Sequence, residues 1–313
     1  MPESPEVAAL VEQLDERARG CVVAAVDLLE FRALKTRARP LSSLVGRRIA
    51  GVHRFGKFID VALDDGHLVV SLGRHGWVRW TDASPQGDLD DPAPDAPARD
   101  ASDRGASSDE SDESGASEAS ASTDTGPPVL AELDLDGAGG GAVLAFTDAG
   151  SWVSLGLWVV DDPHDVPGIA KLGPDPLEPG FSDADVDRAV VGRRKQLKAI
   201  LQEQESFAGI GNAYSDEILH AARLSPLVHG DTLTADERRR LSAAMRDVLV
   251  AAADARRGIP IDALTQAKAD AMRVHGRAGR ACPVCGDTVH DLAFGGTTAQ
   301  YCPTCQTAGE ILG

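Results

Sequence analysis

The chain has 313 residues, 42% of them hydrophobic, and carries a formal net charge of −18 at pH 7. This length predicts two or three compact units. No apolar run reaches the roughly 18 residues that a membrane-spanning helix needs, and the N-terminus lacks the basic and apolar regions of a signal peptide. We therefore expect a cytoplasmic protein.

The acidic charge is concentrated in residues 83–127, which hold twelve Asp or Glu and two Arg and contribute −10, leaving −8 for the remainder. A negative total does not exclude DNA as a partner, because binding depends on where positive charge lies. A segment of Ser, Asp, Glu, Ala, Pro and Gly cannot bury enough apolar surface to offset its ordering entropy. We predict a disordered insertion within a β-rich domain, with an interdomain linker as the alternative.

Apolar residues at helical spacing predict a helix over residues 5–18, which Gly20 ends. Alternating apolar residues then predict strands, with a hairpin turn at Asp64-Asp65-Gly66. The predicted strands are 21–26, 48–52, 58–63, 67–72, 77–80, 129–135, 143–146 and 153–160. From about residue 182 the period becomes helical, and a capping box at 234–237 begins one helix. The predicted order is a β-rich N-terminal domain, a helical middle and a small C-terminal module.

Four of the five cysteines form two Cys-x-x-Cys pairs, Cys282 with Cys285 and Cys302 with Cys305, separated by sixteen residues. Four thiolates at this spacing predict a closed tetrahedral site for one structural Zn²⁺ on a hairpin. Such modules occur in proteins of many functions, so a protein–protein adaptor remains one hypothesis. Cys21 lies in an apolar run and is interpreted as a small core residue.

Two further motifs are weaker signals when taken alone. The turn Gly209-Ile-Gly211-Asn212 leads into a predicted helix, whose N–H groups and dipole can hold a phosphate. An ordinary turn with an Asn cap is the alternative.

The second is Pro2, whose secondary amine becomes free once Met1 is removed. Such an amine can attack an aldehyde or acetal carbon and form an iminium ion, while Glu3 and Glu6 exchange protons. A simple helix start is the alternative interpretation.

Together and in this order, these motifs resemble the formamidopyrimidine-DNA glycosylase and endonuclease VIII family. The resembling segments are Met1-Pro2-Glu3-Ser4-Pro5-Glu6-Val7, Arg54-Phe-Gly56-Lys57, residues 172–177, Gly209-Ile-Gly211-Asn212-Ala-Tyr214 and the four-cysteine hairpin. The resemblance covers the chain except residues 83–127, and it departs at Ser4, where the family usually has Leu.

The resemblance implies an α+β multidomain fold. A catalytic β-sandwich with an N-terminal helix is expected over residues 1–168, and a helical, DNA-binding helix–two-turns–helix domain over 169–262. A zinc-finger β-hairpin domain is expected over 263–313.

The resemblance also implies a monomeric, bifunctional DNA glycosylase and abasic-site lyase of base excision repair. Its partner would be double-stranded DNA with damaged bases or abasic sites, and it would nick the strand by β,δ-elimination. Pro2 would attack C1′ of the damaged nucleotide through a Schiff base, and Glu3 would be the acid that opens the deoxyribose. Lys57 would contact phosphate and be needed for base removal, and Glu6 would support the pocket. The damaged base must leave the stack to reach Pro2.

Contacts with DNA are expected from Asn212, Tyr214 and Lys195. A set of basic residues on segments flanking the motifs is expected to line the DNA groove, although a solvated surface explains any one of them. The set is Arg54, Lys57, Arg74, Arg193, Arg194, Lys195, Lys198, Arg273, Arg277 and Arg280.

The residues that would read the DNA depart from the family pattern. Thr297 replaces the phosphate-binding arginine of the zinc hairpin, which removes a bidentate charge. Arg74 stands where a void-filling Met is usual, and residues 147–152 lack two arginines. Trp152 replaces the aromatic wedge or, alternatively, is a strand core residue. These changes leave the lesion preference open and motivate a second hypothesis, a DNA-damage-binding protein with weak or no base excision.

Overall fold

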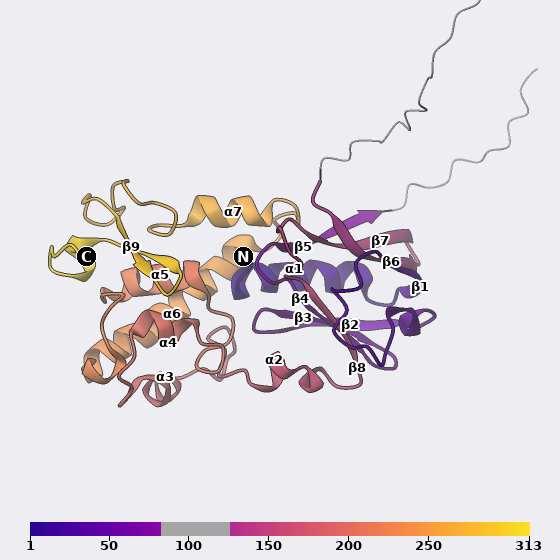
Figure 1. Ribbon diagram of the computed structural model, residues 1–313, viewed down its shortest axis with the longest axis horizontal. Coiled ribbons are helices and arrows are strands. Elements are labelled where there is room, and N and C mark those ends of the chain that lie inside the picture. The colour runs from indigo at the N-terminus through magenta and orange to yellow at the C-terminus, as the bar shows by residue number, and fades with distance from the viewer. Residues whose placement is uncertain (83–125) are drawn as a thin grey trace, which may run out of the picture. The chain divides into compact units, whose positions relative to one another are not determined.

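The computed structural model describes residues 1–82 and 126–313, and Figure 1 shows the arrangement of their helices and strands. The prediction of disorder for 83–127 lies almost entirely outside these residues. The flanking strands β5 (Gly76–Asp82) and β6 (Val129–Gly137) belong to one sheet. The segment between them therefore connects two strands of a single sheet, which contradicts the linker alternative.

The N-terminal region consists of helix α1 and two four-stranded antiparallel sheets, ordered β1-β6-β7-β5 and β2-β3-β4-β8. Both sheets and α1 contribute to one apolar core, which explains their alternating apolar residues. The remaining bounds are α1 Ser4–Ala18, β1 Val22–Leu28, β2 Ile49–Phe55, β3 Phe58–Leu63, β4 His67–Ser71, β7 Gly140–Asp148 and β8 Gly156–Val160, with a 3₁₀ turn at Leu41–Leu44.

The predicted helix and strands are confirmed with small shifts at their ends. The hairpin turn after β3 is present, and Gly66 has a φ of +95°, which favours glycine. The last strand of this region starts at Gly156 rather than at residue 153, because the preceding residues form a turn around Asp148.

A second apolar core belongs to the helical region. Its elements are α3 Asp183–Val190, α4 Leu197–Gln202, α5 Asn212–Ala222 and α6 Ala235–Arg256. The short helix α2 (Pro167–Ala170) instead packs Ile169 against Val69 of β4 and Val160 of β8. The predicted capping box of α6 is confirmed at Thr234 and Glu237. No helix in the described parts of the chain has both the length and the apolar character needed to cross a membrane.

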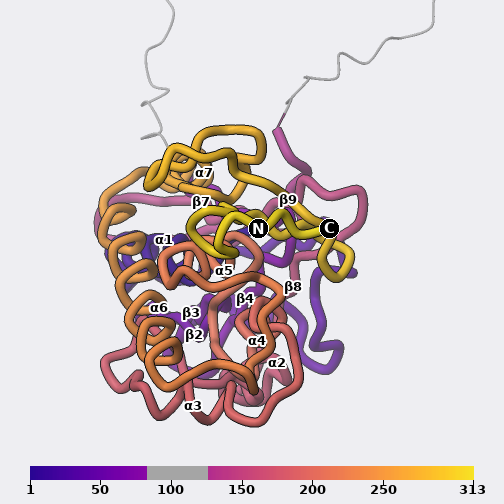
Figure 2. Tube along the Cα trace, turned by 90° about the vertical axis from the view of Figure 1, so that its left-hand side faces the viewer, coloured from indigo at the N-terminus to yellow at the C-terminus, as the bar shows by residue number. Residues whose placement is uncertain are grey.

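The C-terminal region contains α7 (Leu264–Ala271), the hairpin β9 (His290–Phe294) and β10 (Thr297–Tyr301), and the short helix α8 (Pro303–Gln306). Figures 1 and 2 both show the N-terminus lying between α7 and α5. The N-terminal motif therefore lies beside α5, which follows the Gly-Ile-Gly-Asn turn, and beside α7 from the C-terminal region.

Candidate active site

The side chain of Glu3 lies at the N-terminal end of α5 and is 1% exposed. Its carboxylate accepts hydrogen bonds from the backbone N–H groups of Gly211, Ala213 (3.0 Å) and Tyr214 (3.3 Å). A Cβ on Gly211 would lie 2.6 Å from Glu3 Cδ, so this close approach requires glycine. The helix end that the sequence suggested for phosphate therefore holds a carboxylate of the chain itself.

Glu6 is the second buried carboxylate of this cluster. It accepts the backbone N–H of Glu3 at 3.1 Å and the Tyr214 hydroxyl at 2.7 Å, and Arg256 Nε lies 2.7 Å from it. Tyr214 is 1% exposed. The expectation that Tyr214 contacts DNA is therefore wrong, because its hydroxyl orients Glu6 from within the protein.

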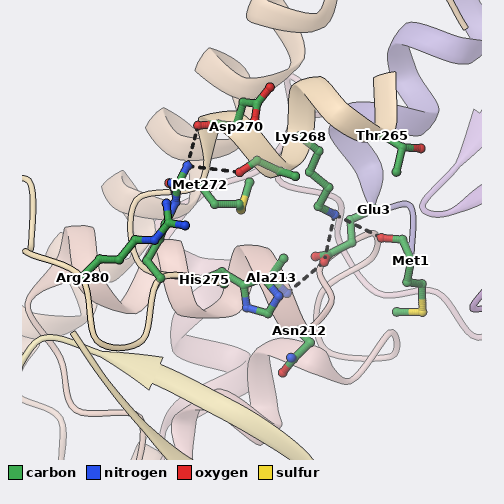
Figure 3. A pocket seen from close by; sticks show the side chains of 13 residues that line it. Met1, Glu3, Asn212, Ala213, Thr265, Lys268, Asp270, Met272, His275 and Arg280 are labelled. Carbon is green, nitrogen blue, oxygen red and sulfur yellow. Dashed lines mark hydrogen bonds and ion pairs between the residues drawn. The ribbon is translucent and has the colours of Figure 1, made fainter. Parts of the chain in front are cut away.

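Lys268 of α7 completes the cluster, and no sequence motif had indicated it. Its Nζ donates to Glu6 Oε2 at 2.9 Å. It also donates to Glu3 Oε1 at 3.3 Å and to the carbonyl oxygen of Met1 at 3.2 Å (Figure 3). The ammonium also lies 4.8 Å from the centroid of the Tyr214 ring. One lysine thus joins both carboxylates to the first peptide group.

The charges of this cluster determine its protonation states. Burial alone would raise the pKa of Glu3, but Lys268, Lys57 and the backbone N–H groups lower it to about 2. Burial opposes the charge of Lys268 as well, yet Glu3 and Glu6 raise its pKa above the ordinary lysine value. Glu3 is therefore a carboxylate and Lys268 an ammonium at neutral pH.

Lys57 lies in the two-residue turn between β2 and β3, and its Nζ would lie 2.9 Å from a Cβ on Gly211. Burial lowers its pKa, although Glu3 acts in the opposite direction. Among the described residues Lys57 has neither a hydrogen-bond partner nor an ion-pair partner for its ammonium. A partly buried cation without a partner is a favourable site for an anion such as phosphate.

Asn212 and Thr297 lie together on the same side of the site. Thr297 Oγ1 is 3.5 Å from Asn212 Oδ1 and donates to the Phe294 carbonyl at 2.8 Å, and Gln202 Nε2 donates to Asn212 Oδ1 at 2.9 Å. Because both contacts use Asn212 Oδ1 as the acceptor, they do not engage the side-chain N–H groups of Asn212. The structure thus brings together two residues that are 85 positions apart.

Several basic residues expected in the DNA groove are engaged inside the protein. Lys198 is fully buried and donates to Asp216 at 2.7 Å, and Arg54 pairs with Asp175 at 2.6 Å. The groove prediction is wrong for these two. Lys195 is half-exposed and forms an ion pair with Glu203, outside the cavities at the N-terminus. The structure does not bring it to the candidate site.

Arg74 and Trp152 lie on two loops that are tied together. The carboxylate of Asp148 accepts the N–H and hydroxyl of Ser154 at 2.7 and 2.8 Å, and Ser154 Oγ accepts the N–H of Arg74 at 3.0 Å. This turn leaves Trp152 72% exposed. The strand-core alternative for Trp152 is therefore wrong.

Two cavities adjoin the N-terminus, one of about 560 Å³ and one of about 230 Å³, and both contact Met1 and Lys268. Figure 3 shows the larger one, with Glu3, Asn212 and Lys268 around it. The smaller one is lined by Pro2, Glu6, Arg74, His75 and Trp77, among others. The amine-bearing end of the chain is therefore accessible from two sides.

Comparison with known proteins agrees with this geometry. Family models match the formamidopyrimidine-DNA glycosylase N-terminal domain over residues 1–149 and its H2TH domain over 172–261. A formamidopyrimidine-DNA glycosylase of Nocardioides sp. is 32% identical over 321 residues, with 98% of this chain and 95% of that protein covered. The chain belongs to the formamidopyrimidine-DNA glycosylase family.

Other members of the formamidopyrimidine-DNA glycosylase family support the assignment. A Mycobacterium tuberculosis protein named an uncharacterized formamidopyrimidine-DNA glycosylase-like protein is 43% identical over 146 residues, covering 47% of this chain and 91% of that protein. The crystal structure of the MutM (Fpg) protein from Thermus thermophilus superposes with a TM-score of 0.71 at 29% identity, covering 97% and 98% of the two chains. Family and fold are thus as the sequence predicted.

The C-terminal cysteines match the zinc finger found in FPG and IleRS, over residues 279–308. All four Sγ atoms lie within 4.8 Å of one another, which suits thiolates that share one tetrahedral Zn²⁺. His220 of α5 lies with its Nε2 3.3 Å from Cys282 Sγ. The predicted structural zinc site is confirmed, and a hydrogen bond connects it to the helix that holds Glu3.

Proposed function

We propose that this protein is a bifunctional DNA glycosylase and abasic-site lyase, which removes oxidised bases and nicks the strand by β,δ-elimination. The single observation that carries the proposal is the buried cluster of Glu3, Glu6 and Lys268 around the first peptide group. A structural helix start does not need two carboxylates and an ammonium, because burying them costs free energy that a plain cap avoids.

Pro2 is the nucleophile in this proposal, after removal of Met1. It lines the smaller cavity, and Glu3 and Glu6 fix its backbone from the following turn. In the chain that still carries Met1, burial, followed by the charge of Lys268, lowers the pKa of the Met1 amino group, and the Pro2 amine would lie beside the same lysine. A lowered pKa leaves more of a secondary amine unprotonated and able to attack C1′.

The DNA partner is a duplex with a damaged base or an abasic site, bound by a monomer. Lys57 and Asn212 supply phosphate contacts beside the nucleophile, with Thr297 in a weaker role. Arg74 and Trp152 extend from loops next to Pro2 and are the groups available to fill the space of a flipped nucleotide. The domain boundaries of the proposal are those expected from the sequence, 1–168, 169–262 and 263–313.

A DNA-damage-binding protein with weak base excision is the second candidate. It is favoured by Thr297, which cannot supply the bidentate contacts of an arginine. The partly buried Lys57, which has no ion-pair partner among the described residues, favours the enzyme, since a binding protein has no need for it beside the proposed amine.

A panel of lesion duplexes tests the two candidates. Protein whose N-terminus is shown by mass spectrometry to be Pro2 is assayed for base release, strand cleavage and borohydride-trapped adducts. We expect all three with at least one oxidised base, and an adduct with abasic DNA. Tight binding to lesions without release or adduct would support the second candidate instead.

A further inference from the structure

We propose that His220 helps to retain zinc by donating a hydrogen bond from its Nε2–H to the thiolate of Cys282, without binding the metal itself. His220 lies in none of the sequence motifs. The inference rests on the four-cysteine site and does not depend on the proposed function.

The contact between His220 and Cys282 is short and shielded from water. His220 Nε2 lies 3.3 Å from Cys282 Sγ, and the two residues are 4% and 3% exposed. Among the described residues, His220 is the only side chain other than a cysteine that hydrogen-bonds to any of the four Sγ atoms. Hydrogen bonds are electrostatically stronger where water is excluded. This contact therefore acts on the charge of one particular sulfur.

The chemistry of zinc binding fixes the direction of this hydrogen bond. A cysteine that binds zinc is a thiolate and has no hydrogen to donate. The imidazole must therefore be the donor, which it can be both as the neutral ring with its hydrogen on Nε2 and as the cation. The four thiolates already complete the tetrahedral set of a structural zinc site, so the imidazole is not needed as a ligand.

Donation to the sulfur favours the zinc-bound state over the metal-free state. Four thiolates carry more negative charge than one Zn²⁺ neutralises, and a buried N–H donor offsets part of that excess. When the metal leaves, the sulfur regains a proton, and a neutral thiol is a weaker acceptor than a thiolate. The hydrogen bond is therefore stronger with zinc bound, and it slows the loss of the metal.

Helix α5 holds the imidazole in place for this bond. His220 lies in the last turn of the helix, whose first N–H groups bind the carboxylate of Glu3. Just beyond the same helix end, the Leu224 carbonyl accepts Gln306 Nε2–H at 2.9 Å, and Gln306 Oε1 accepts the N–H of Cys302 at 2.9 Å. The helix end and the cysteine module are thus tied at two points, so the imidazole needs little reorganisation to reach the sulfur.

The test compares zinc release from full-length, zinc-loaded H220F and H220Q with release from the wild-type protein. Phenylalanine keeps a ring but has no donor, whereas the glutamine amide can place an N–H near the position of Nε2. We expect release to an excess of a chromogenic chelator to be about tenfold faster in H220F, as is usual when a residue that supports a metal ligand is lost. H220Q should stay close to the wild-type rate. H229F, at an exposed histidine, is the matched control.

Cobalt substitution gives a second readout, which a purely structural role of His220 would not change. In the Co²⁺-loaded protein, the sulfur-to-metal charge-transfer absorption reports the electron density on the thiolates. A hydrogen bond to sulfur lowers the energy of its lone pair. We therefore expect this absorption at longer wavelength in H220F than in the wild-type protein and H220Q. If H220F does not fold, H220M replaces it, since its side chain also lacks an N–H.

Three outcomes would overturn the proposal. The first is zinc release from H220F at the wild-type rate, and the second is release from H220Q that is as fast as from folded H220F. The third is a wild-type cobalt spectrum typical of mixed sulfur and nitrogen ligands, because His220 would then bind the metal itself. Both measurements are made without DNA, so their results are independent of the proposed function.

Discussion

The buried cluster around the N-terminus differs in construction from the segments that we propose to face DNA. In the cluster, Glu3, Glu6 and Lys268 are buried and bonded to one another across distant parts of the chain. On the loops, Trp152 is exposed, and Thr297 replaces a charged residue of the family pattern. The comparison teaches that the groups proposed for chemistry are buried in mutual contacts, whereas the side chains proposed to face DNA are exposed and can change with little cost to the fold.

The largest loss of unfolding free energy is expected when one member of a buried ion pair is removed. K198M removes the lysine that pairs with the fully buried carboxylate of Asp216, which then keeps only the contact with His275 Nδ1 on its other oxygen. Loss of one member of a buried pair costs about 3–5 kcal/mol. Urea unfolding measures this loss, and K35M, at an exposed lysine, should stay within about 0.5 kcal/mol of wild type. Equal stability of K198M and K35M would contradict the prediction that the buried pair supports the fold far more than an exposed lysine does.

Acid should also weaken the cluster through Glu3. Its pKa is about 2 in the folded chain, against an ordinary value of 4.5. Its stabilisation is therefore fully present above about pH 5 and is lost as the pH falls toward 2, with a magnitude of the order of 3 kcal/mol. We expect E3Q to show a shallower fall in unfolding free energy over this range. E16Q, at an exposed glutamate of α1, should follow wild type.

Replacing Pro2 tests the chemistry itself. A primary amine on flexible Gly gives a neutral imine and is less well aligned, so P2G should lose about 100-fold in base excision. DNA affinity should change far less, because Pro2 makes no phosphate contact in the proposal. Single-turnover kinetics and binding isotherms on one lesion duplex measure the two quantities. Parallel losses in both would place Pro2 in binding rather than in chemistry.

At Thr297, which we propose to face DNA, a substitution is expected to increase DNA affinity rather than reduce it. T297R restores a cation beside Asn212 and should tighten DNA binding about tenfold at low salt, with the salt slope steeper by about 0.9. T298R adds the same charge to the neighbouring residue, whose side chain points to the opposite face of the hairpin. It should gain less. An equal gain would show that only net charge matters at this hairpin.

The smallest effect on stability is expected at Trp152. W152A should unfold within about 0.5 kcal/mol of wild type, because the side chain is largely in solvent. Base excision should nevertheless fall about tenfold if the indole stacks on a base, and the preference for the opposite base should change. F31A, at another exposed aromatic residue, is the control. A W152A variant with unaltered excision would remove Trp152 from the DNA interface.

The sequence predicted features whose causes are local. Apolar periodicity placed α1 and the strands to within a few residues, and the spacing of four cysteines identified the zinc site. Lys268 was missed because it meets Glu3 across 265 positions, and no local pattern encodes such a contact. Arg54 and Lys198 were assigned to DNA because charge alone does not reveal the acidic partners Asp175 and Asp216 that fold against them.

Helix α5 connects the four-cysteine site to the buried cluster at the N-terminus of the chain. Its first N–H groups hold the Glu3 carboxylate, and one face of its last turn presents His220 to Cys282. The helix has only 11 residues, so it spans roughly 16 Å. Oxidation of the thiols or removal of zinc would thus free one end of the helix whose other end holds the Glu3 carboxylate. In a cell under oxidative stress, the repair activity would depend on the redox state of the protein's own cysteines.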